Sequence, residues 1–554
     1  MNGSAAVATT VFGIAMVATI LIGVWSARGR SKGLAEWSVS SRGLGVLFIW
    51  LLMAGETYTS FSFLGTAGWS YSFGAPILYL VAYLTVGFAV AYVVGPALWT
   101  YASRHGLISI ADIAEFRFRS RPVGVVVAVV ATVFIVPYIQ VQIQGMGVVV
   151  NAMTYGNVDL KVAAVISFVV AEVFILVSGL RGSAWLSVLK DMLVIVAVVF
   201  LAVYIPMHYL GGFSDFMQRM VSEKREWLTF PGHESGGRDG VWFLSTVVLN
   251  AVTITIFPTT VAGYLSAKSP NALRRNALLL PWYQLLLFVP MVVGATALFV
   301  MPTLGNPDLA LFSLVTDSLP SPVVALIGVA GALSAIVPMS VFMLSIGTLW
   351  GRTVLGGGNG ADPRARRRVL GKAGDASDMR TKRLSQLVCV VAGLIALAGS
   401  LFYPNTLVEL SVLSYEGLAQ LVPVVLLALY WRRLTARAAV AGMVAGLAVM
   451  TGLWATENDP FLGVNGGIIA LAVNLVVVVV VVWVAPGAEP GSGVGPGAGA
   501  GVAGPASGLV PGPPGCPEVG GSGPGVKGAP SSRRLRRLRF ASPLTPGPPP
   551  REVN

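Results

Sequence analysis

The sequence predicts an all-α polytopic membrane protein with about 13 transmembrane helices, and three observations lead to this prediction. Of its 554 residues, 55% are hydrophobic and only 11% are charged, with a mean hydropathy of +0.77. Soluble domains carry about 25% charged residues. Apolar runs of about 20 residues, the length that crosses a bilayer, recur from residue 5 to residue 485. Basic residues gather in every second loop between these runs.

Hydropathy defines the expected spans in order along the chain. The first has no basic leading segment and no small-residue cleavage site, so we expect a retained helix rather than a signal peptide. The expected spans are 5–25, 44–66, 76–98, 123–148, 161–180, 188–208, 241–262, 279–301, 321–349, 387–404, 408–431, 438–455 and 463–485.

The formal net charge of +13 predicts orientation rather than a nucleic-acid partner. Lysine and arginine cluster after the odd-numbered spans one to eleven, and the positive-inside rule assigns those loops to the cytoplasm. The loop 209–240, which this rule assigns to the outside, also contains basic residues, but acidic residues in the same loop balance their charge. We therefore expect a multi-pass plasma-membrane protein with its amino terminus outside and its carboxyl terminus in the cytoplasm.

The sequence contains no pattern that predicts an enzyme. The three histidines have no ligand-like spacing, and no nucleotide-binding loop or nucleophile motif is present. Cys389 and Cys516 show neither metal nor disulfide spacing. We expect no catalytic residue, no cofactor, no metal other than a coupling ion, and no obligate protein partner; the expected partners are the lipid bilayer and a small solute.

Two apolar spans are interrupted by polar residues. The stretch LLMAGETYTSFSFLGTAG (residues 51–68) carries Glu56, although a charge near the bilayer centre costs about 2.5 to 3.5 kcal/mol. Span seven has Asn250, Thr253 and Thr255 before Pro258. Broken helices expose carbonyls for a cation and helix amino termini for an anion in transporters. Spans two and seven lie five apart, as the first helices of two five-helix inverted repeats would.

Single hydroxyls in membrane helices are more often structural than functional, whereas the carboxylate of Glu56 favours a functional role. In span four, Gln140, Gln142 and Gln144 cannot share one helical face unless Pro137 disturbs the helix, so only Gln140 is a site candidate, beside Tyr138. Glu416 marks either a gate or a span edge. For the adjacent Lys190 and Asp191, near a cytoplasmic end, we expect a structural ion pair or snorkelling.

Pro338 would break span nine and leave serine hydroxyls and carbonyls nearby as oxygen ligands for a hard cation.

Four ordered motifs resemble the sodium:solute symporter family. They are GETYTSFSFLGTAGWSYSFGAP, VPYIQVQIQGMGVVV, SGLRGSAWLSVLKD and FPTTVAGYLSAKSPNALRRNALLLPWY. The similarity covers roughly residues 35 to 440 and is greatest to bacterial monocarboxylate permeases, with pantothenate and proline permeases more distant. It implies a LeuT-type five-plus-five inverted repeat, with one helix before the repeats and two after them, and sodium-coupled solute symport by alternating access.

The resemblance also implies site residues. The coupling ion would lie between spans two and nine, and the solute beside span two. The expected substrate-binding residues are Thr57, Thr59, Phe61, Tyr138, Gln140, Asn250 and Thr253. The expected ion-binding residues are Gly55, Tyr58, Met339, Ser340, Phe342 and Met343, with Glu56 as the coupling candidate.

One departure from the family pattern lies in span nine. Family members place one or two hydroxyls where this chain has Phe342 and Met343, while Ser340 and Ser345 are only nearby. Either a shifted register supplies a serine, or sodium binding is weakened or replaced by proton coupling through Glu56. Sodium is the expected ion and the proton is the alternative.

The expected function is cation:solute symport of a small organic solute, with a monocarboxylate as first expectation. The alternatives are a proton-coupled symporter or uniporter for a vitamin or amino acid, and a non-transporting sensor on the same fold.

The expected domains are 1–43 (first helix and basic loop), 44–262 (first repeat and the start of the second), 263–404 (the rest of the second, with basic loop 351–386), 405–485 (additional helices) and 486–554 (a disordered Gly/Pro-rich tail). The basic block 531–540 in that tail is expected to be solvated rather than bound to lipid.

Overall fold

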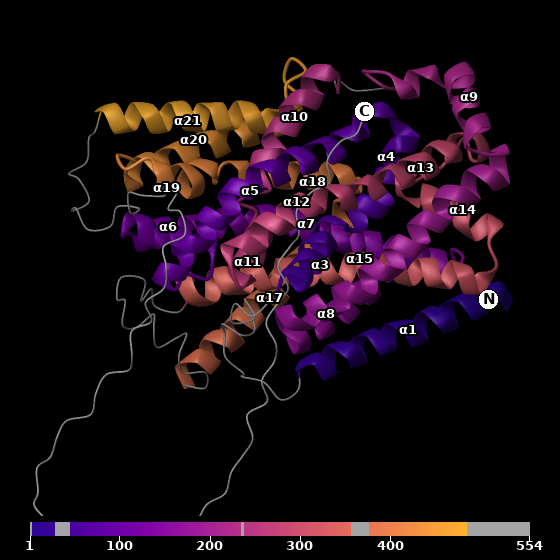
Figure 1. Ribbon diagram of the computed structural model, residues 1–554, viewed down its shortest axis with the longest axis horizontal. Helices are drawn as coiled ribbons and strands as arrows, with labels where there is room; N and C mark the ends of the chain where they lie inside the picture. Colours follow the sequence, from indigo (N-terminus) through magenta and orange to yellow (C-terminus); the bar gives the residue numbers. More distant parts are fainter. Residues whose placement is uncertain (1–2, 28–44, 234–237, 356–375, 485–554) are drawn as a thin grey trace, which may run out of the picture. The chain divides into compact units, whose positions relative to one another are not determined.

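A computed structural model describes residues 3–27, 45–233, 238–355 and 376–484 (Figure 1). These residues are almost entirely helices and their connections, and the β pairing among them is one isolated bridge between Phe461 and Val464. The described helices belong to one compact unit, Met1–Glu489. The predicted tail 486–554 with its basic block, the loop 28–43 and most of the loop 351–386 lie outside the described residues.

The helices follow the expected spans closely. The long helices are α1 (Gly3–Ala27), α5 (Tyr79–His105), α7 (Arg121–Met153), α8 (Leu160–Leu210), α15 (Ser321–Thr348), α17 (Ala376–Phe402), α20 (Ala436–Ala455) and α21 (Gly466–Val484). Helices of intermediate length are α3 (Val46–Thr57), α4 (Thr66–Ser72), α10 (Gly240–Thr253), α11 (Pro258–Ser266), α12 (Pro270–Gln284), α13 (Phe288–Val300) and α18 (Leu407–Ala419).

Shorter elements lie in the connections or continue the longer helices. The short α-helices are α6 (Ile110–Phe118), α9 (Phe213–Glu223), α14 (Ala310–Ser318) and α19 (Ala428–Tyr430). Segments of π-helix are η2 (Phe61–Gly65), η7 (Leu349–Val354) and η9 (Pro423–Leu427). Segments of 3₁₀-helix are η3 (Ala75–Leu78), η4 (Arg225–Leu228), η5 (Leu285–Leu287) and η6 (Pro307–Leu309).

Among the described residues, 11 helices are long and apolar enough to cross a membrane, or 12 if one bent pair is counted as a single span. The expected number was about 13. The expected spans 161–180 and 188–208 both lie within α8, a helix of 51 residues. Only its part Gly182–Leu210 is among the 11.

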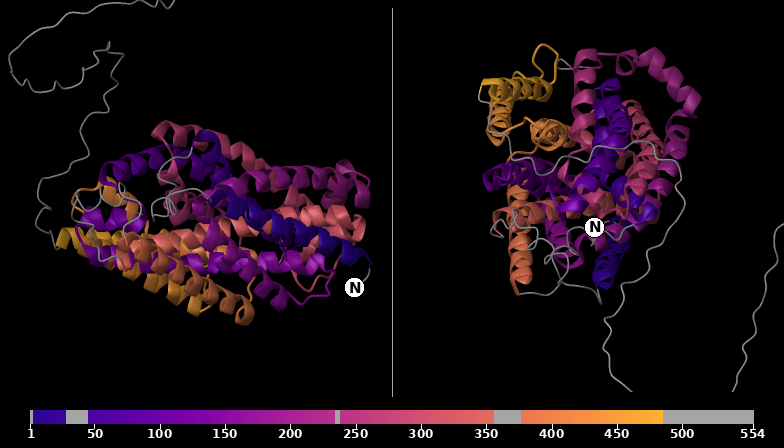
Figure 2. Two further views of the ribbon diagram at one scale, coloured as in Figure 1. Left: turned by 90° about the horizontal axis from the view of Figure 1, so that it is seen from below. Right: turned by 60° about the vertical axis from the view of Figure 1, so that its left-hand side comes forward.

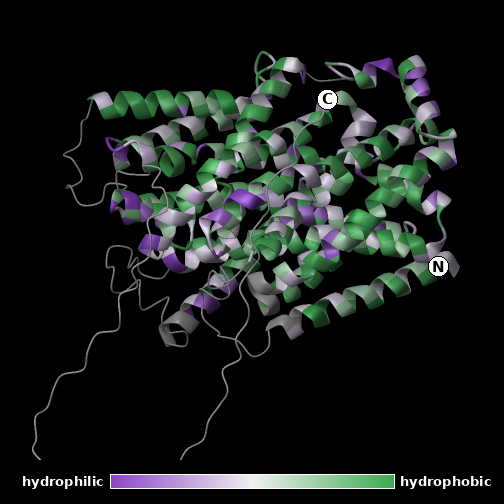
Figure 3. Cartoon of the chain, in the orientation of Figure 1, coloured by the Kyte–Doolittle hydropathy of each residue, from purple (hydrophilic) through white to green (hydrophobic). Residues whose placement is uncertain are grey.

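Burial separates central helices from peripheral ones. In the most apolar window of the span Ser321–Val354, which contains α15, 89% of residues are buried, against 28% for the span that contains α1. Apolar residues cover most of both kinds of helix (Figure 3), as expected where the outer surface faces lipid. Helix α15 packs against α7 and α8, and α20 and α21 lie side by side at one edge (Figures 1 and 2). The core of the unit therefore surrounds α15.

Both interrupted spans are broken helices. Helix α3 ends at Thr57, and the chain resumes at η2 with a bend of 55° between Val46–Thr57 and Phe61–Ser72. Helix α10 ends at Thr253, and α11 begins at Pro258, whose missing N–H suits the first helical position. Helix α11 packs against α3, so the two breaks meet inside the unit.

Candidate functional site

The break in span two is held by its own hydroxyls. The Thr57 hydroxyl donates to the Ala54 carbonyl at 3.0 Å, and the Ser62 hydroxyl donates to the Thr57 carbonyl at 2.7 Å. Gln284, at the end of α12, donates to the Thr57 hydroxyl at 3.0 Å. Hydroxyls that bond back to the chain replace part of the lost helical ladder. Two hydroxyls of the run after Glu56, those of Thr57 and Ser62, therefore stabilise the break itself.

Glu56 joins the two broken helices. Its side chain is buried, and its Oε1 accepts hydrogen bonds from the hydroxyls of Thr259 and, at 3.2 Å, Thr260. Both threonines lie in the first turn of α11, where the helix dipole favours a negative charge. The carboxylate thus connects the end of α3 to the start of α11.

A small polar cavity lies between the breaks. Its volume is about 20 Å³, room for about one water molecule. An organic solute therefore requires its walls to move apart. The lining residues are Glu56, Thr57, Tyr83, Leu84, Tyr138, Ile254, Phe257, Thr260, Phe342 and Tyr415.

The expected substrate-binding residues divide into two groups. Thr57 and Tyr138 line the cavity, together with Glu56. The others do not line it: Thr59, Phe61, Gln140, Asn250 and Thr253. The Thr253 hydroxyl donates to the Leu249 carbonyl of its own helix at 2.7 Å. The Asn250 side chain is buried in the same helix, α10.

The glutamine that reaches the broken helix is Gln142 rather than Gln140. The Gln142 side-chain oxygen accepts from the backbone N–H of Ser60 at 3.3 Å, just after the break. Gln140 instead donates to the Tyr403 carbonyl at 3.0 Å, away from the cavity. Because the helix α7 continues through Pro137, the two glutamines face different neighbours.

The remaining polar candidates have structural partners. Glu416 accepts a hydrogen bond from the side chain of Asn465 at 2.8 Å, just before α21. On α15, the Ser340 hydroxyl donates to the Val337 carbonyl at 2.6 Å and lies 2.5 Å from the Ser183 hydroxyl of α8. The Met343 carbonyl accepts from Cys389 at 3.0 Å. Met339, Phe342 and Met343 are all buried, and only Phe342 among them lines the cavity.

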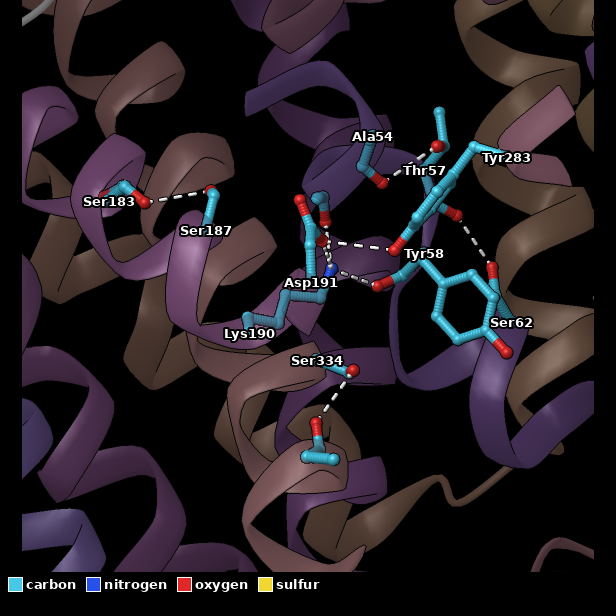
Figure 4. A network of polar contacts seen from close by, with 12 residues as sticks. Ala54, Thr57, Tyr58, Ser62, Ser183, Ser187, Lys190, Asp191, Tyr283 and Ser334 are labelled. Carbon is cyan, nitrogen blue, oxygen red and sulfur yellow. Dashed lines mark hydrogen bonds and ion pairs between the residues drawn. The ribbon is translucent and has the colours of Figure 1, made fainter. Parts of the chain in front are cut away.

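Lys190 does not snorkel. Its side chain is 0% exposed, and its Nζ donates to the carbonyls of Gly55 and Tyr58, each at 2.5 Å (Figure 4). The expected ion pair is present but loose, with Nζ 3.8 Å from Asp191 Oδ1. Tyr283 of α12 donates to the same carboxylate oxygen at 3.2 Å. The expectation of snorkelling was therefore wrong, because the freed carbonyls hold the ammonium inside the protein.

Sequence reasoning missed several lining residues. Phe257 immediately precedes Pro258, and Thr260 lies two residues after it. Both are therefore next to the break in span seven, which the sequence does indicate. Tyr83 and Tyr415 come from α5 and α18 and hydrogen-bond each other at 3.2 Å. No local pattern marks these tyrosines, because aromatic residues are common in apolar spans.

Comparison with known proteins defines the family. The family model described as "Sodium:solute symporter family" matches residues 37–351 and 367–446. The chain belongs to the sodium:solute symporter family. It is similar to two Bacillus subtilis proteins described as uncharacterized symporters, YhjB and YodF. YhjB is 34% identical over 84% of this chain and 94% of the relative, and YodF is 29% identical over 84% and 90%.

More distant relatives have descriptions that name a transported solute. A Rhizobium johnstonii protein described as a monocarboxylate transport permease is 24% identical over 79% of this chain and 88% of its own length. Among solved structures, a Na⁺-coupled sialic acid symporter in a substrate-bound outward-open state has a TM-score of 0.69 at 14% identity. It covers 87% of this chain and 98% of its own. The symporter described here therefore has the LeuT-type fold, and it is a transporter rather than an enzyme.

The residues of this symporter do not fit a sodium ion at the position that the family implies. Gly55 and Tyr58 supply carbonyls, but the ammonium of Lys190 already contacts both. Phe342 and Met343 offer apolar side chains from α15. The two carbonyls that the family resemblance assigns to the ion are therefore already contacted by a side chain of the protein itself.

Proposed function

We propose that this chain imports a small organic solute across the plasma membrane by cation-coupled symport and alternating access, with a monocarboxylate as the first substrate class. Family membership supports secondary transport. The observation that carries the proposal is the polar cavity between two broken helices that Glu56 ties together. Two half-helices that meet at one polar cavity form the arrangement in which transporters bind a solute.

Sodium is the ion that the family supports, and the proton is the alternative. The Lys190 ammonium contacts the two carbonyls expected to bind sodium. This contact supports the proton alternative, because those carbonyls already have a cationic partner. The proposed orientation has the amino terminus outside and the carboxyl terminus in the cytoplasm, on the positive-inside rule.

The monocarboxylate proposal is supported by the similarity to the Rhizobium protein described as a monocarboxylate transport permease. In this chain, Tyr83, Tyr138 and Tyr415 line the cavity, and a tyrosine hydroxyl is a donor suited to a carboxylate. The amino terminus of α11 also favours a negative group. These donors make an acid a suitable ligand, although no lysine or arginine of the described part of the chain lines the cavity.

One observation favours a second substrate class. Glu56 lines the cavity, and its carboxylate would repel a bare anion but attract an ammonium group. A zwitterionic amino acid would place its carboxylate at the tyrosine hydroxyls and its ammonium at Glu56. An amino acid is therefore the second candidate solute.

The test is uptake by the purified protein in proteoliposomes. Labelled pyruvate, acetate, proline and pantothenate are offered separately, with sodium and pH gradients imposed one at a time. Accumulation of one solute under one gradient supports symport, and its identity decides between the acid and the amino acid. Uptake indifferent to both gradients would favour a uniporter, and no uptake under any condition would favour a sensor on the same fold.

A further inference from the structure

The end of α3 presents two carbonyls that have left the helical ladder. Helix α3 ends at Thr57, and Tyr58 has φ −94° and ψ 81°, outside the helical region. The last carbonyls of a helix lack amide partners and need another donor. Inside a membrane protein, water cannot supply that donor freely. A cation or a strong donor must therefore face Gly55 and Tyr58.

The Lys190 side chain supplies that donor. Its Nζ lies 2.5 Å from both carbonyl oxygens, and Figure 4 shows the side chain reaching from α8 to the break. Helix α8 comes so close that a methyl group added at Gly55 would lie 3.0 Å from Ser187 Oγ. Little space is left between Gly55 and α8 for a separate ion.

The third wall of this position, α15, offers few free oxygens to an ion. The Ser340 hydroxyl already bonds to Val337 and Ser183, and the Met343 carbonyl already accepts from Cys389. Ser345 is buried, and its hydroxyl has no hydrogen-bond partner, but it lies two residues beyond the register that the family uses. A sodium ion needs several oxygen ligands, and this wall does not supply them.

The local charges are already balanced. Asp191 on α8 faces Lys190 at 3.8 Å, and the ionisable group that α12 contributes is the hydroxyl of Tyr283. Residues 321–348 of α15 contain no ionisable side chain, and Glu56 on α3 bonds to α11 instead. Tyr58, at the break, contributes a neutral ring and hydroxyl. A sodium ion added here would meet the ammonium without a further carboxylate to offset the repulsion.

We infer that the Lys190 ammonium is a tethered cation in the position of the coupling sodium ion, so that this symporter binds no sodium between spans two and nine. The inference rests on the proposed function, since it concerns what drives that symport. Transport by this chain is then independent of sodium, unlike the coupling that the family implies.

The first test is binding of ²²Na⁺ to the purified full-length protein in detergent, which requires no solute. The expected result is no saturable binding by the wild type. Saturable binding, displaced by unlabelled sodium but not by potassium, would overturn the inference.

Three variants locate the effect. Lys190→Ser removes the ammonium and frees both carbonyls, so we expect saturable ²²Na⁺ binding to appear. Lys190→Arg keeps the charge and is expected to bind no sodium. Lys161→Ser, at an exposed position of the same helix, is the matched control and is also expected to bind none. If Lys190→Ser is monodisperse, binds no sodium and still transports as the wild type does, no cation is needed there and the inference fails.

Uptake separates this inference from the proposed function. Replacing sodium by choline on both sides should leave wild-type uptake of the transported solute unchanged. A sodium gradient that drives accumulation would support symport but overturn the tethered cation. Absence of uptake for all four solutes would count against the proposed function, whereas the ²²Na⁺ measurement would still decide the role of Lys190. If Lys190→Ser does not fold, the wild type and Lys190→Arg are sufficient for the binding test.

Discussion

Two buried side chains of opposite charge hold the break in span two, and each has partners that compensate its burial. A charge at the bilayer centre costs about 2.5 to 3.5 kcal/mol. Hydrogen bonds to charged groups contribute about 1.5 to 3 kcal/mol each. Glu56 accepts two such bonds from α11, and Lys190 donates two to α3. Two bonds per charge are of the size needed to offset that cost.

The substitution Glu56→Gln tests the charge apart from the hydrogen bonds. The glutamine oxygen still accepts from Thr259 and Thr260, so we expect a folded protein in the membrane. Without the negative charge, gradient-driven accumulation should be lost. Glu56→Ala should in addition be destabilised by about 1 to 3 kcal/mol, because buried hydroxyl donors lose their acceptor. Uptake and thermal unfolding of both variants provide the measurement.

Glu172→Gln is the matched control for that experiment. Glu172 is a second buried carboxylate, on α8, and neither of its oxygens has a hydrogen-bond partner. It does not line the cavity, so its neutralisation should leave accumulation intact. Wild-type accumulation by Glu56→Gln would remove Glu56 from the coupling mechanism, whatever the control does.

At the scale of helices, small residues set how closely the half-helices approach their neighbours. Gly294 of α13 faces the backbone of α4, the second half of the broken span two. A Cβ at Gly294 would overlap the carbonyl of Ala67. Close backbone approach at small residues is the usual way in which membrane helices pack. The position of α4 therefore depends on the absence of a side chain at residue 294.

Gly294→Ala should destabilise the symporter by about 1 to 3 kcal/mol, because α4 or α13 must move and overpacked sites rarely relax completely. Gly452→Ala in α20 is the matched control, since a Cβ there meets no atom within 4 Å. It should be neutral or slightly stabilising, as alanine is the better helix former. Thermal unfolding of the two purified variants measures the difference. Equal melting temperatures would mean that α4 and α13 are not in close contact.

At the scale of the whole molecule, the proposed orientation rests on charge and on the number of spans together. The basic loops alternate with loops that are almost free of lysine and arginine. An odd number of spans puts the two termini on opposite sides. Helix α8 covers two of the expected spans, and an unbroken helix crosses a bilayer once, so the proposed topology requires the chain to reverse direction between these two spans.

Reporter fusions test that topology. Green fluorescent protein fused after residue 554 should fluoresce, and alkaline phosphatase fused there should be inactive, because both reporters distinguish the cytoplasm from the outside. Fusions to loop 209–240 should give the opposite pair of results. An active phosphatase at the carboxyl terminus would contradict the positive-inside assignment and imply an even number of spans or an inverted protein.

Hydropathy predicted the spans and both breaks because each depends on a local property, the free energy of transferring a short segment into lipid. It also pointed to Glu56, since a carboxylate in an apolar run is visible without any knowledge of contacts. It predicted two separate spans, 161–180 and 188–208, where the structure has the single helix α8. The reason is that the polar residues around Arg181 look like a loop in the sequence.

The sequence by itself determined the membrane class, the family and the location of the broken helices, because these features are carried by composition and by contiguous motifs. Only the tertiary structure decided which side chains meet at the breaks. Lys190 lies 135 residues from Gly55, and Thr259 lies 203 residues from Glu56. No periodicity relates positions so far apart. Their contacts arise because α8 and α11 pack against α3, and that packing places an ammonium where the sequence had suggested a sodium ion.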